Sequence, residues 1–459
     1  MAGIGFELRR IFGKKTLVAN TFGVIYASLT TVGPSIVFLM LLFSLRQMMF
    51  NFGMGEKDSM FFTFSFTYIF LLAILNSAFQ NGVLSRYISD KIFEQKEDDI
   101  SASMFGMLTV SSVVASIQVT VLCVLMYQKD QFSLLFLVAY YLLGILATAS
   151  YNLITYISAL KEYKKVTLAY FMGVLIIFMA LFVFHKSLNL PLILATYWAL
   201  VVGFFVMNVM LIMFSVKAFG NPSEHYFEFL MYFKKHPLLI ISSFAWILGF
   251  YVSNIIYWFL SDMKETVSIF STAPNYDLAI FISILINLSG MIIFEVKTET
   301  RFYDKYIAYL SALNSGIYKV IERERVSLQN TINIQLFFVY EVQLIITVIL
   351  IFLVNIFYPY LGANSQVLNM FLLTGLGLYT AFCMYFTTVF LYYFDDHISA
   401  CIGPSVFFGV VVIGALICSR IGAPYYPIPL LVGGISGWIV SFILLRKRMK
   451  NLNAYLLCH

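Results

Sequence analysis

The chain has 459 residues, of which 61% are hydrophobic and only 11% are charged. A soluble protein of this length could not cover its surface with so few charged side chains. The formal net charge of +6 reflects the bias of membrane-protein loops rather than a nucleic-acid-binding surface. We therefore expect contact with a lipid bilayer and none with nucleic acid.

Twelve apolar stretches are long enough, or nearly so, to cross a bilayer, because a hydrocarbon core about 30 Å thick requires about 20 apolar residues in a helix. Before them, residues 1–16 place Ile4, Leu8, Ile11 and Phe12 on one helical face, which predicts an amphipathic helix in the membrane interface. The predicted spans are 17–45, 60–84, 101–126, 131–160, 166–184, 190–216, 238–260, 276–295, 332–357, 366–394, 400–419 and 425–445.

The basic residues predict the orientation of the chain. With the N-terminus in the cytoplasm, 23 of the 29 Lys and Arg residues fall on inner segments and 6 on outer ones. The positive-inside rule therefore places both termini on the cytoplasmic side of the inner membrane, with 446–459 as a basic cytoplasmic tail. One inner loop, 395–399, carries no Lys or Arg and does not support the assignment.

The spans fall into two sets of six, which predicts an all-α membrane protein of two pseudo-symmetric six-helix lobes with a substrate path between them. The lobes cover 17–216 and 238–445, and 217–237 joins them as a cytoplasmic linker. In each half the longest inner loop follows the second span, and these loops open with similar residues at Arg86 and Arg301. We expect both arginines to anchor inner helix ends or to contact a partner.

Polar side chains inside the spans are candidates for the path, because at bilayer depth they tend to face a bundle interior or a wet cavity. The alternative is that they form hydrogen bonds that hold the bundle together. Three helical stripes qualify. They are Asn76, Ser77 and Gln80 in the second span, Thr148, Tyr151, Asn152 and Thr155 in the fourth, and Trp246, Ser253, Asn254 and Tyr257 in the seventh.

Two carboxyl groups and one helix break add to this set. Glu341 lies about 13 Å along the ninth span, near the midplane, where it could bind a cation, carry a proton, contact a sugar, or pack as a protonated group. Asp277 begins the eighth span and either lines the path or caps its helix. Gly33-Pro34 interrupts the first span as a hinge or a fixed kink.

Several absences also bear on function. No Lys or Arg occupies the middle of any span, which disfavours a path for a lipid-linked diphosphate and suits a neutral or cationic cargo. We find no nucleotide-binding loop, no zinc pattern and no cysteine framework, and we expect no enzymatic activity, cofactor or metal. The inner loop 296–331 could dock a partner, and its Glu322–Arg325 run is expected to be a solvated face.

Three segments resemble the PelG family, the inner-membrane proteins of Pel exopolysaccharide biosynthesis. They are Met1–Arg10, Thr31–Pro34 and Glu299–Tyr303. The resemblance implies the multidrug/oligosaccharidyl-lipid/polysaccharide exporter superfamily, whose fold is two six-helix lobes around a central cavity. It further implies a cytosolic glycosyltransferase partner, other membrane subunits of the Pel complex, and a hexosamine-rich polysaccharide of the biofilm matrix.

The sequence thus favours a transporter that passes a growing exopolysaccharide across the inner membrane. Three alternatives stay open at this point: a flippase of a lipid-linked oligosaccharide, an ion-coupled multidrug-type antiporter, and a membrane-embedded glycosyltransferase or polymerase. The outer loops are short for a catalytic domain, and the missing core cations disfavour the flippase. Polymerisation or an ion gradient could supply the energy.

Overall fold

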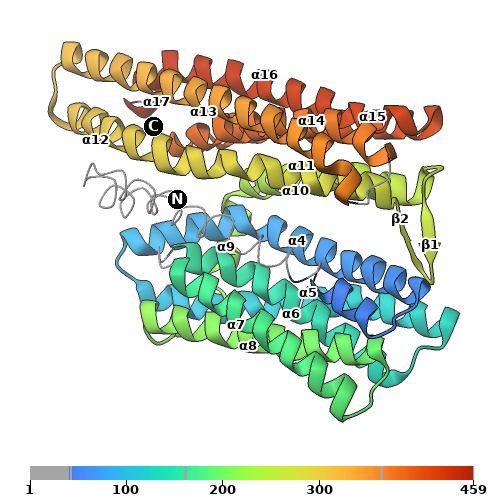
Figure 1. The fold of residues 1–459 in the computed structure, drawn as a ribbon. Helices are drawn as coiled ribbons and strands as arrows, with labels where there is room; N and C mark the ends of the chain where they lie inside the picture. The colour runs from blue at the N-terminus through green and yellow to red at the C-terminus, as the bar shows by residue number, and fades with distance from the viewer. Residues whose placement is uncertain (1–40, 42–43, 160–162, 362–364, 458–459) are drawn as a thin grey trace, which may run out of the picture. The chain divides into compact units, whose positions relative to one another are not determined.

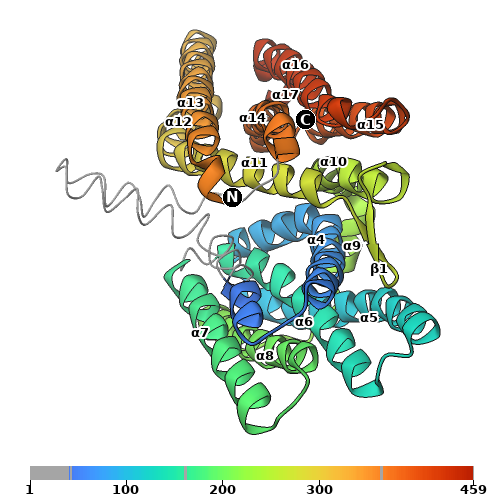
Figure 2. The ribbon, with the colours of Figure 1, turned by 45° about the vertical axis from the view of Figure 1, so that its right-hand side comes forward.

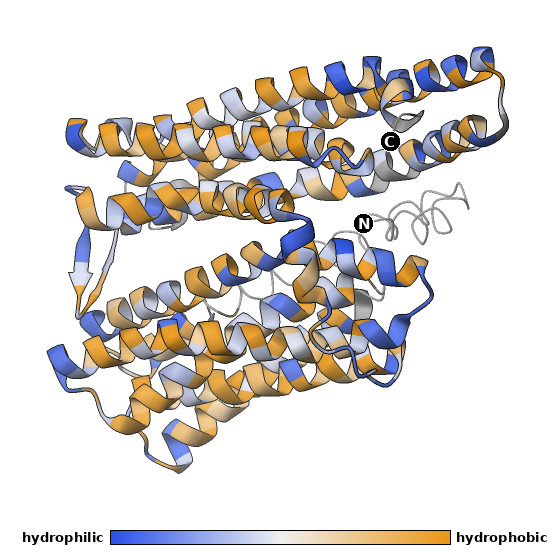
Figure 3. Ribbon diagram, turned by 180° about the vertical axis from the view of Figure 1, so that it is seen from behind, coloured by the Kyte–Doolittle hydropathy of each residue, from blue (hydrophilic) through white to orange (hydrophobic). Residues whose placement is uncertain are grey.

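The computed structural model describes residues 41, 44–159, 163–361 and 365–457 (Figure 1). Among these residues, eleven helices are long and apolar enough to cross a membrane. Hydrophobic residues cover most of their length, and hydrophilic residues gather toward the helix ends (Figure 3). The chain is therefore an all-α, multi-pass membrane protein, as predicted. The predicted amphipathic helix 1–16 and the Gly33-Pro34 break lie outside the described residues.

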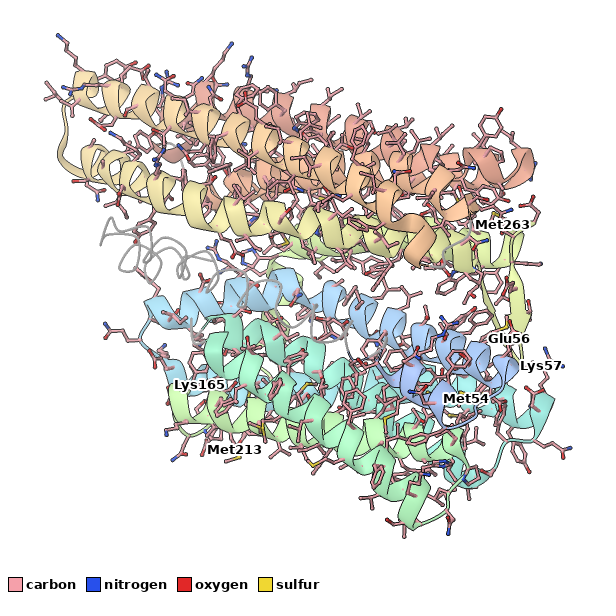
Figure 4. All side chains as sticks on the ribbon, viewed as in Figure 1. Met54, Glu56, Lys57, Lys165, Met213 and Met263 are labelled. Carbon is pink, nitrogen blue, oxygen red and sulfur yellow. The ribbon has the colours of Figure 1, made fainter. Side chains whose placement is uncertain are left out.

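The first compact unit extends to Ile247 and also includes the segment Glu265–Thr272. In this unit α4, α5 and α8 all pack against α6, and α7 packs against α8. Charged side chains mark both ends of these helices, with Lys57 and Lys165 at opposite ends (Figure 4). Its helices are α4 (Glu56–Phe93), α5 (Glu97–Asp130), α6 (Leu134–Ala159), α7 (Tyr163–Phe182) with a π-helical turn (Val183–Ser187), α8 (Leu192–Phe219) and α9 (Phe229–Lys235).

The second unit contains Leu248–Lys264 and the chain from Ala273 onward. Here α11, α13, α15 and α16 surround α14 (Figure 2). Gly377 and Gly434 bring α14 and α16 together, since a Cβ on Gly434 would lie 2.6 Å from the Gly377 carbonyl oxygen. Its elements are α10 (Pro237–Leu260, which begins in the first unit), α11 (Pro274–Ile293), a π-helical turn (Phe294–Glu299), α12 (Thr300–Ser315), α13 (Tyr318–Leu361), α14 (Ser365–Tyr393), α15 (His397–Ile421), a 3-10 turn (Ala423–Tyr425), α16 (Ile428–Lys450) and α17 (Leu452–Leu457).

The two units share one packing pattern. The pairs α4–α6, α6–α8 and α7–α8 of the first unit correspond in span order to α11–α14, α14–α16 and α15–α16 of the second, and all six pairs are in contact. The pairs α5–α6 and α13–α14 correspond in the same way. The corresponding contacts agree with an internal repeat, and the two six-span lobes stay a prediction.

Several elements differ from the predicted bounds. The helix α13 begins fourteen residues before the predicted start at 332, so the inner loop 296–331 is largely helical. A second difference is a two-stranded antiparallel hairpin, β1 (Glu265–Val267) and β2 (Phe270–Thr272), between the predicted spans 238–260 and 276–295, where the sequence predicts only a loop. The helices run on because charged residues end a span but do not end a helix, whose backbone stays bonded in water.

Candidate functional site

Glu341 lies near the middle of its bundle, on a face of α13 that is exposed in its own unit. The depth follows from its neighbour Tyr340, whose ring packs 5.0 Å from that of Trp438, halfway along α16. The Tyr340 hydroxyl also lies 2.6 Å from Thr387 Oγ1 of α14. The exposed apolar residues around Glu341 on this face are Ile334, Phe337, Phe338, Leu344, Ile345 and Val348.

The contacts of the Glu341 carboxyl bear on its possible roles. Within the described part of the chain its carboxyl makes no hydrogen bond or ion pair, and the packing alternative stays beside the functional ones. A carboxyl facing lipid at this depth is costly, which favours cover by water, protein or cargo. Its place in a transport path stays a prediction. The described residues hold no group of three or more His, Cys, Asp and Glu arranged for a metal ion.

Asp277 ties the adjoining ends of α10 and α11 together. Its carboxylate accepts hydrogen bonds from Asn254 Nδ2 at 2.7 Å and from Trp258 Nε1 at 3.0 Å, both on α10. It also accepts the backbone N–H of Ala273, the residue before α11, at 3.3 Å. Asp277 thus caps the start of α11, as the capping alternative predicts, and also binds a second helix, α10. A role of Asp277 and Asn254 in the path stays a prediction.

Tyr257 is fully buried in an aromatic cluster beside this clamp. Its ring stacks on Tyr426 with centroids 4.2 Å apart, and its hydroxyl donates to the Tyr426 carbonyl oxygen at 3.1 Å. Tyr276 packs edge-on at 4.8 Å and donates to Ser253 Oγ at 3.0 Å. Ser253 and Tyr257 of the predicted stripe thus form hydrogen bonds that hold helices together.

In the first unit the predicted stripes differ in how well their polar groups are satisfied. Asn76 of α4 exchanges two hydrogen bonds with Gln118 of α5, at 2.8 and 3.2 Å, so it stabilises helix packing. Asn152 of α6 is 1% exposed, and neither of its amide atoms has a partner among the described residues. Gln80 Oε1 is also buried without a hydrogen-bond partner among the described residues. Tyr151 is half-buried, with its ring against Phe70.

Unsatisfied buried amides cost free energy, so a partner beyond the described residues, such as water, cargo or another part of the chain, would stabilise Asn152 and Gln80. The two stripes belong to helices that pack together, and Thr155 of α6 donates to Asn81 Oδ1 of α4. Asn152 and Gln80 are therefore the members of these stripes that best keep a functional interpretation.

Arg86 and Arg301, which open the two similar inner loops, have different surroundings. Arg86 pairs with Asp90 one turn later on α4, with Nε 3.1 Å from a carboxylate oxygen. Arg301 is exposed on α12. Each is followed by a buried aromatic residue, Tyr87 at 0% and Phe302 at 1% exposure, so the similarity between the two loops includes the burial of this next side chain. Whether either arginine contacts a partner stays a prediction.

A buried cation at the end of α4 was missed by the sequence analysis. Lys91 is 3% exposed, and its Nζ lies 2.8 Å from Asp99 of α5 and 3.0 Å from both oxygens of Glu228. Ser223 donates to the same Asp99 at 2.6 Å. Because Ser223 and Glu228 belong to the segment 217–237, this segment is fixed to the first unit rather than free.

A second ion pair joins the loop 395–399, which carries no Lys or Arg, to the end of α16. Asp396 accepts a hydrogen bond from Arg448 Nε at 2.5 Å and from the Ser399 backbone N–H at 3.1 Å. Burial alone would raise the pKa of Asp396, but the bonds from Arg448 and Ser399 outweigh it and hold the pKa below its ordinary value. The cation missing from the loop is thus supplied by the end of α16.

This pair predicts an acid-dependent loss of stability. A lowered folded-state pKa means that the pair stabilises the protein above the ordinary carboxyl pKa, about 3.9, and that this contribution is lost as the pH falls through the folded pKa. We expect Asp396→Asn to unfold at a lower temperature than wild type at about pH 6, and by a smaller margin at about pH 3, below the ordinary carboxyl pKa. Thermal unfolding of detergent-solubilised protein measures this. An equal gap at both pH values would show that folding leaves the pKa of Asp396 unshifted.

The Glu322–Arg325 run is solvated only in part, because Arg323 is exposed whereas Glu322 and Arg325 are bonded into the fold. Arg325 donates to the Glu322 carboxylate at 2.6 Å and to the Met449 carbonyl oxygen at 2.7 Å. Asn453 of α17 donates to Glu322 at 2.8 Å and accepts from the Tyr309 hydroxyl of α12 at 2.8 Å. Burial raises the pKa of Tyr309 to about 12, which keeps this hydroxyl a donor.

Comparisons with known proteins give one family and one fold. The family model of PelG, described as an exopolysaccharide exporter (EPS-E), matches residues 1–456. An outward-facing multidrug resistance MATE family transporter of the MOP superfamily superposes with a TM-score of 0.64 at 13% identity, covering 93% of this chain and 96% of that one.

Two further solved structures are similar. A MOP superfamily transporter from Pyrococcus furiosus gives a TM-score of 0.59 at 13% identity, over 93% of this chain and 96% of its own. An inward-facing MATE family transporter gives 0.57 at 14% identity, over 90% and 94%. No curated protein matches the chain. At these identities the likeness shows the fold, which is that of membrane transporters rather than of enzymes.

Proposed function

Because the chain belongs to the PelG family of exopolysaccharide exporters, we propose that it passes a growing Pel-type, hexosamine-rich polysaccharide across the inner membrane for the biofilm matrix. The observation that carries this proposal is the match to the family over residues 1–456, together with the transporter fold. Both termini are proposed to be cytoplasmic.

The polar groups of the spans suit such a cargo. A polysaccharide presents hydroxyls and amides, which uncharged side chains such as Gln80, Tyr151 and Asn152 can bind without the cations that a diphosphate requires. We propose that these residues and Glu341 line the path, and that Asn76, Asn254, Tyr257 and Asp277 shape it by holding its helices.

The polymer requires an enzyme that makes it, and we propose that a cytosolic glycosyltransferase hands the chain over directly, beside other membrane subunits. To test this, affinity-tagged protein is purified from native membranes in mild detergent, and transfer of sugar from a nucleotide sugar is measured in the eluate. We expect activity to co-purify with the tagged chain and to be absent from an eluate of a tagged, unrelated multi-pass protein. If the cells export polymer but no activity co-purifies, the proposed partnership would be wrong and the proposed export function would be unaffected.

The proposed orientation makes a separate prediction. In a chain without native cysteines, an impermeant maleimide added to intact cells should label Lys264→Cys, which lies beside the hairpin, and not Asn314→Cys at the end of α12. Both positions are exposed, so access within the protein is matched. Labelling of Asn314→Cys from outside would reverse the orientation.

One alternative keeps a specific observation in its favour. The solved structures of this fold include multidrug resistance transporters, and a lone carboxyl at mid-bundle suits ion coupling. An antiporter would change the sensitivity of cells to cationic drugs when deleted, with no change in secreted polymer. We expect the reverse result.

A further inference from the structure

The β1–β2 hairpin belongs to one unit while both of its flanks belong to the other. The chain passes from the second unit into the hairpin between Lys264 and Glu265, and returns between Thr272 and Ala273. Because Glu265 and Thr272 are paired across the two strands, these junctions lie side by side. The charge rule assigns this end of the bundle to the outside.

The hairpin is bound to the first unit through a buried aromatic. Phe270 is 0% exposed, with its ring centroid 5.0 Å from Tyr68, 6.0 Å from Phe61 and 6.1 Å from Tyr140. Beside it, the Tyr68 hydroxyl donates to the Ser271 carbonyl oxygen at 2.8 Å and accepts the Ser271 N–H at 3.3 Å. Release of the hairpin would expose the ring and break both bonds.

The turn of the hairpin is held as well. Ser268 adopts φ = 58°, a left-handed conformation that is unfavourable for a residue other than glycine. Its carbonyl oxygen accepts a bond from Lys129 Nζ at 2.7 Å, and its hydroxyl donates to the Asp130 carboxylate. These two contacts at the end of α5 offset the cost of the strained turn only while the hairpin stays attached.

On the other side of the junctions the flanks are fixed to the second unit. Ala273, the first residue after the hairpin, donates its N–H to Asp277, which also binds Asn254 and Trp258 of α10. Before the hairpin, the Tyr426 hydroxyl bonds to Asp262. No residue separates the hairpin from either flank, so little slack remains between the two sets of bonds.

We propose that the hairpin is a permanent tether. It stays bound to α4, α5 and α6 throughout transport, so the outer ends of α10 and α11 cannot part from the first unit. Movement between the two units must then pivot about the two adjacent junctions. The competing possibility is a latch that releases the first unit in each cycle.

Covalent capture distinguishes a tether from a latch. Asp130→Cys with Ser268→Cys, in a chain without the five native cysteines, places two thiols where the side chains now form a hydrogen bond. Bond formation is read by maleimide-PEG counting of free thiols, which does not depend on cargo. The control is Thr266→Cys with Ser271→Cys, whose side chains lie 2.9 Å apart and whose disulfide joins only β1 to β2.

For a tether, we expect the Asp130/Ser268 disulfide to form fully and polymer export to be equal before and after its reduction. Export that stops on oxidation and returns on reduction, with the strand control unaffected, would show a latch and overturn the proposal. Failure of the disulfide to form while the control pair oxidises would also overturn it. If the reduced double variant and the wild type both exported no polymer, the proposed function would fail instead, and the thiol count would still report the attachment.

A second variant tests whether the attachment is used. Phe270→Ala should weaken the hold of the hairpin and lower export at unchanged protein abundance. The Asp130/Ser268 disulfide added to Phe270→Ala should restore export when oxidised and not when reduced. Full export by Phe270→Ala with its hairpin thiols freely labelled would show that transport does not need the tether.

Discussion

Glu341→Gln is expected to leave protein abundance near wild type and to reduce polymer export about tenfold or more, the size expected when a step loses roughly 1.4 kcal/mol of stabilisation. Gln keeps the shape and the hydrogen-bonding groups of Glu but cannot ionise or hold a cation. Folding should be unaffected, because Glu341 is exposed in its unit and makes no bond within the described residues. Secreted polymer and membrane abundance are measured together.

The matched control is Ile345→Gln. Ile345 is 58% exposed on the same face of α13, one turn from Glu341, so the change adds an amide without removing a carboxyl. We expect its export to be normal. Normal export by Glu341→Gln, with loss of the protein in Glu341→Ala, would identify a packing residue and remove Glu341 from the path.

Lys91→Met is expected to lower the stability of the first unit by about 3–5 kcal/mol, because removal of one partner leaves buried charge uncompensated. Asp99 is 5% exposed, and it would then face Glu228 with no cation between them. We expect low membrane abundance and a lowered unfolding temperature in detergent. The linker residues around Ser223 and Glu228 should become accessible to protease.

The control for Lys91 removes the repulsion between the two carboxylates as well as the cation. Adding Asp99→Asn and Glu228→Gln to Lys91→Met leaves three neutral groups, and we expect most of the abundance to return. If the triple variant were no more abundant than Lys91→Met, the Lys91 side chain would matter through its packing on Tyr87 rather than through charge.

Periodicity and hydropathy were enough to place the membrane helices that the structure describes. The predicted spans 190–216 and 238–260 agree with α8 and α10 to within about three residues. Disagreement concentrates where a helix leaves the hydrocarbon, as at the start of α13, because composition reports the membrane boundary and not the end of backbone bonding. The hairpin was missed because its strands have three residues each, too few for an alternating pattern to stand out.

The site was less predictable than the fold. Polar stripes could be found from spacing alone, but spacing could not separate Asn76, which Gln118 satisfies, from Asn152, whose amide has no partner in the described chain. The Lys91–Glu228 contact joins residues 137 positions apart, and no local pattern carries that information. Glu341 stood out from sequence because charge in an apolar span is rare whatever its partners are.

The unbroken length of α13 has a mechanical consequence. Tyr318 at its first turn is 73% exposed, and Glu341 follows on the same helix about 35 Å away at 1.5 Å per residue. The helix contains no proline and no break between them, and Arg325 clamps its base to the end of α16. A partner protein that bound the exposed end of α13 and tilted the helix about that clamp would therefore also move the carboxyl of Glu341.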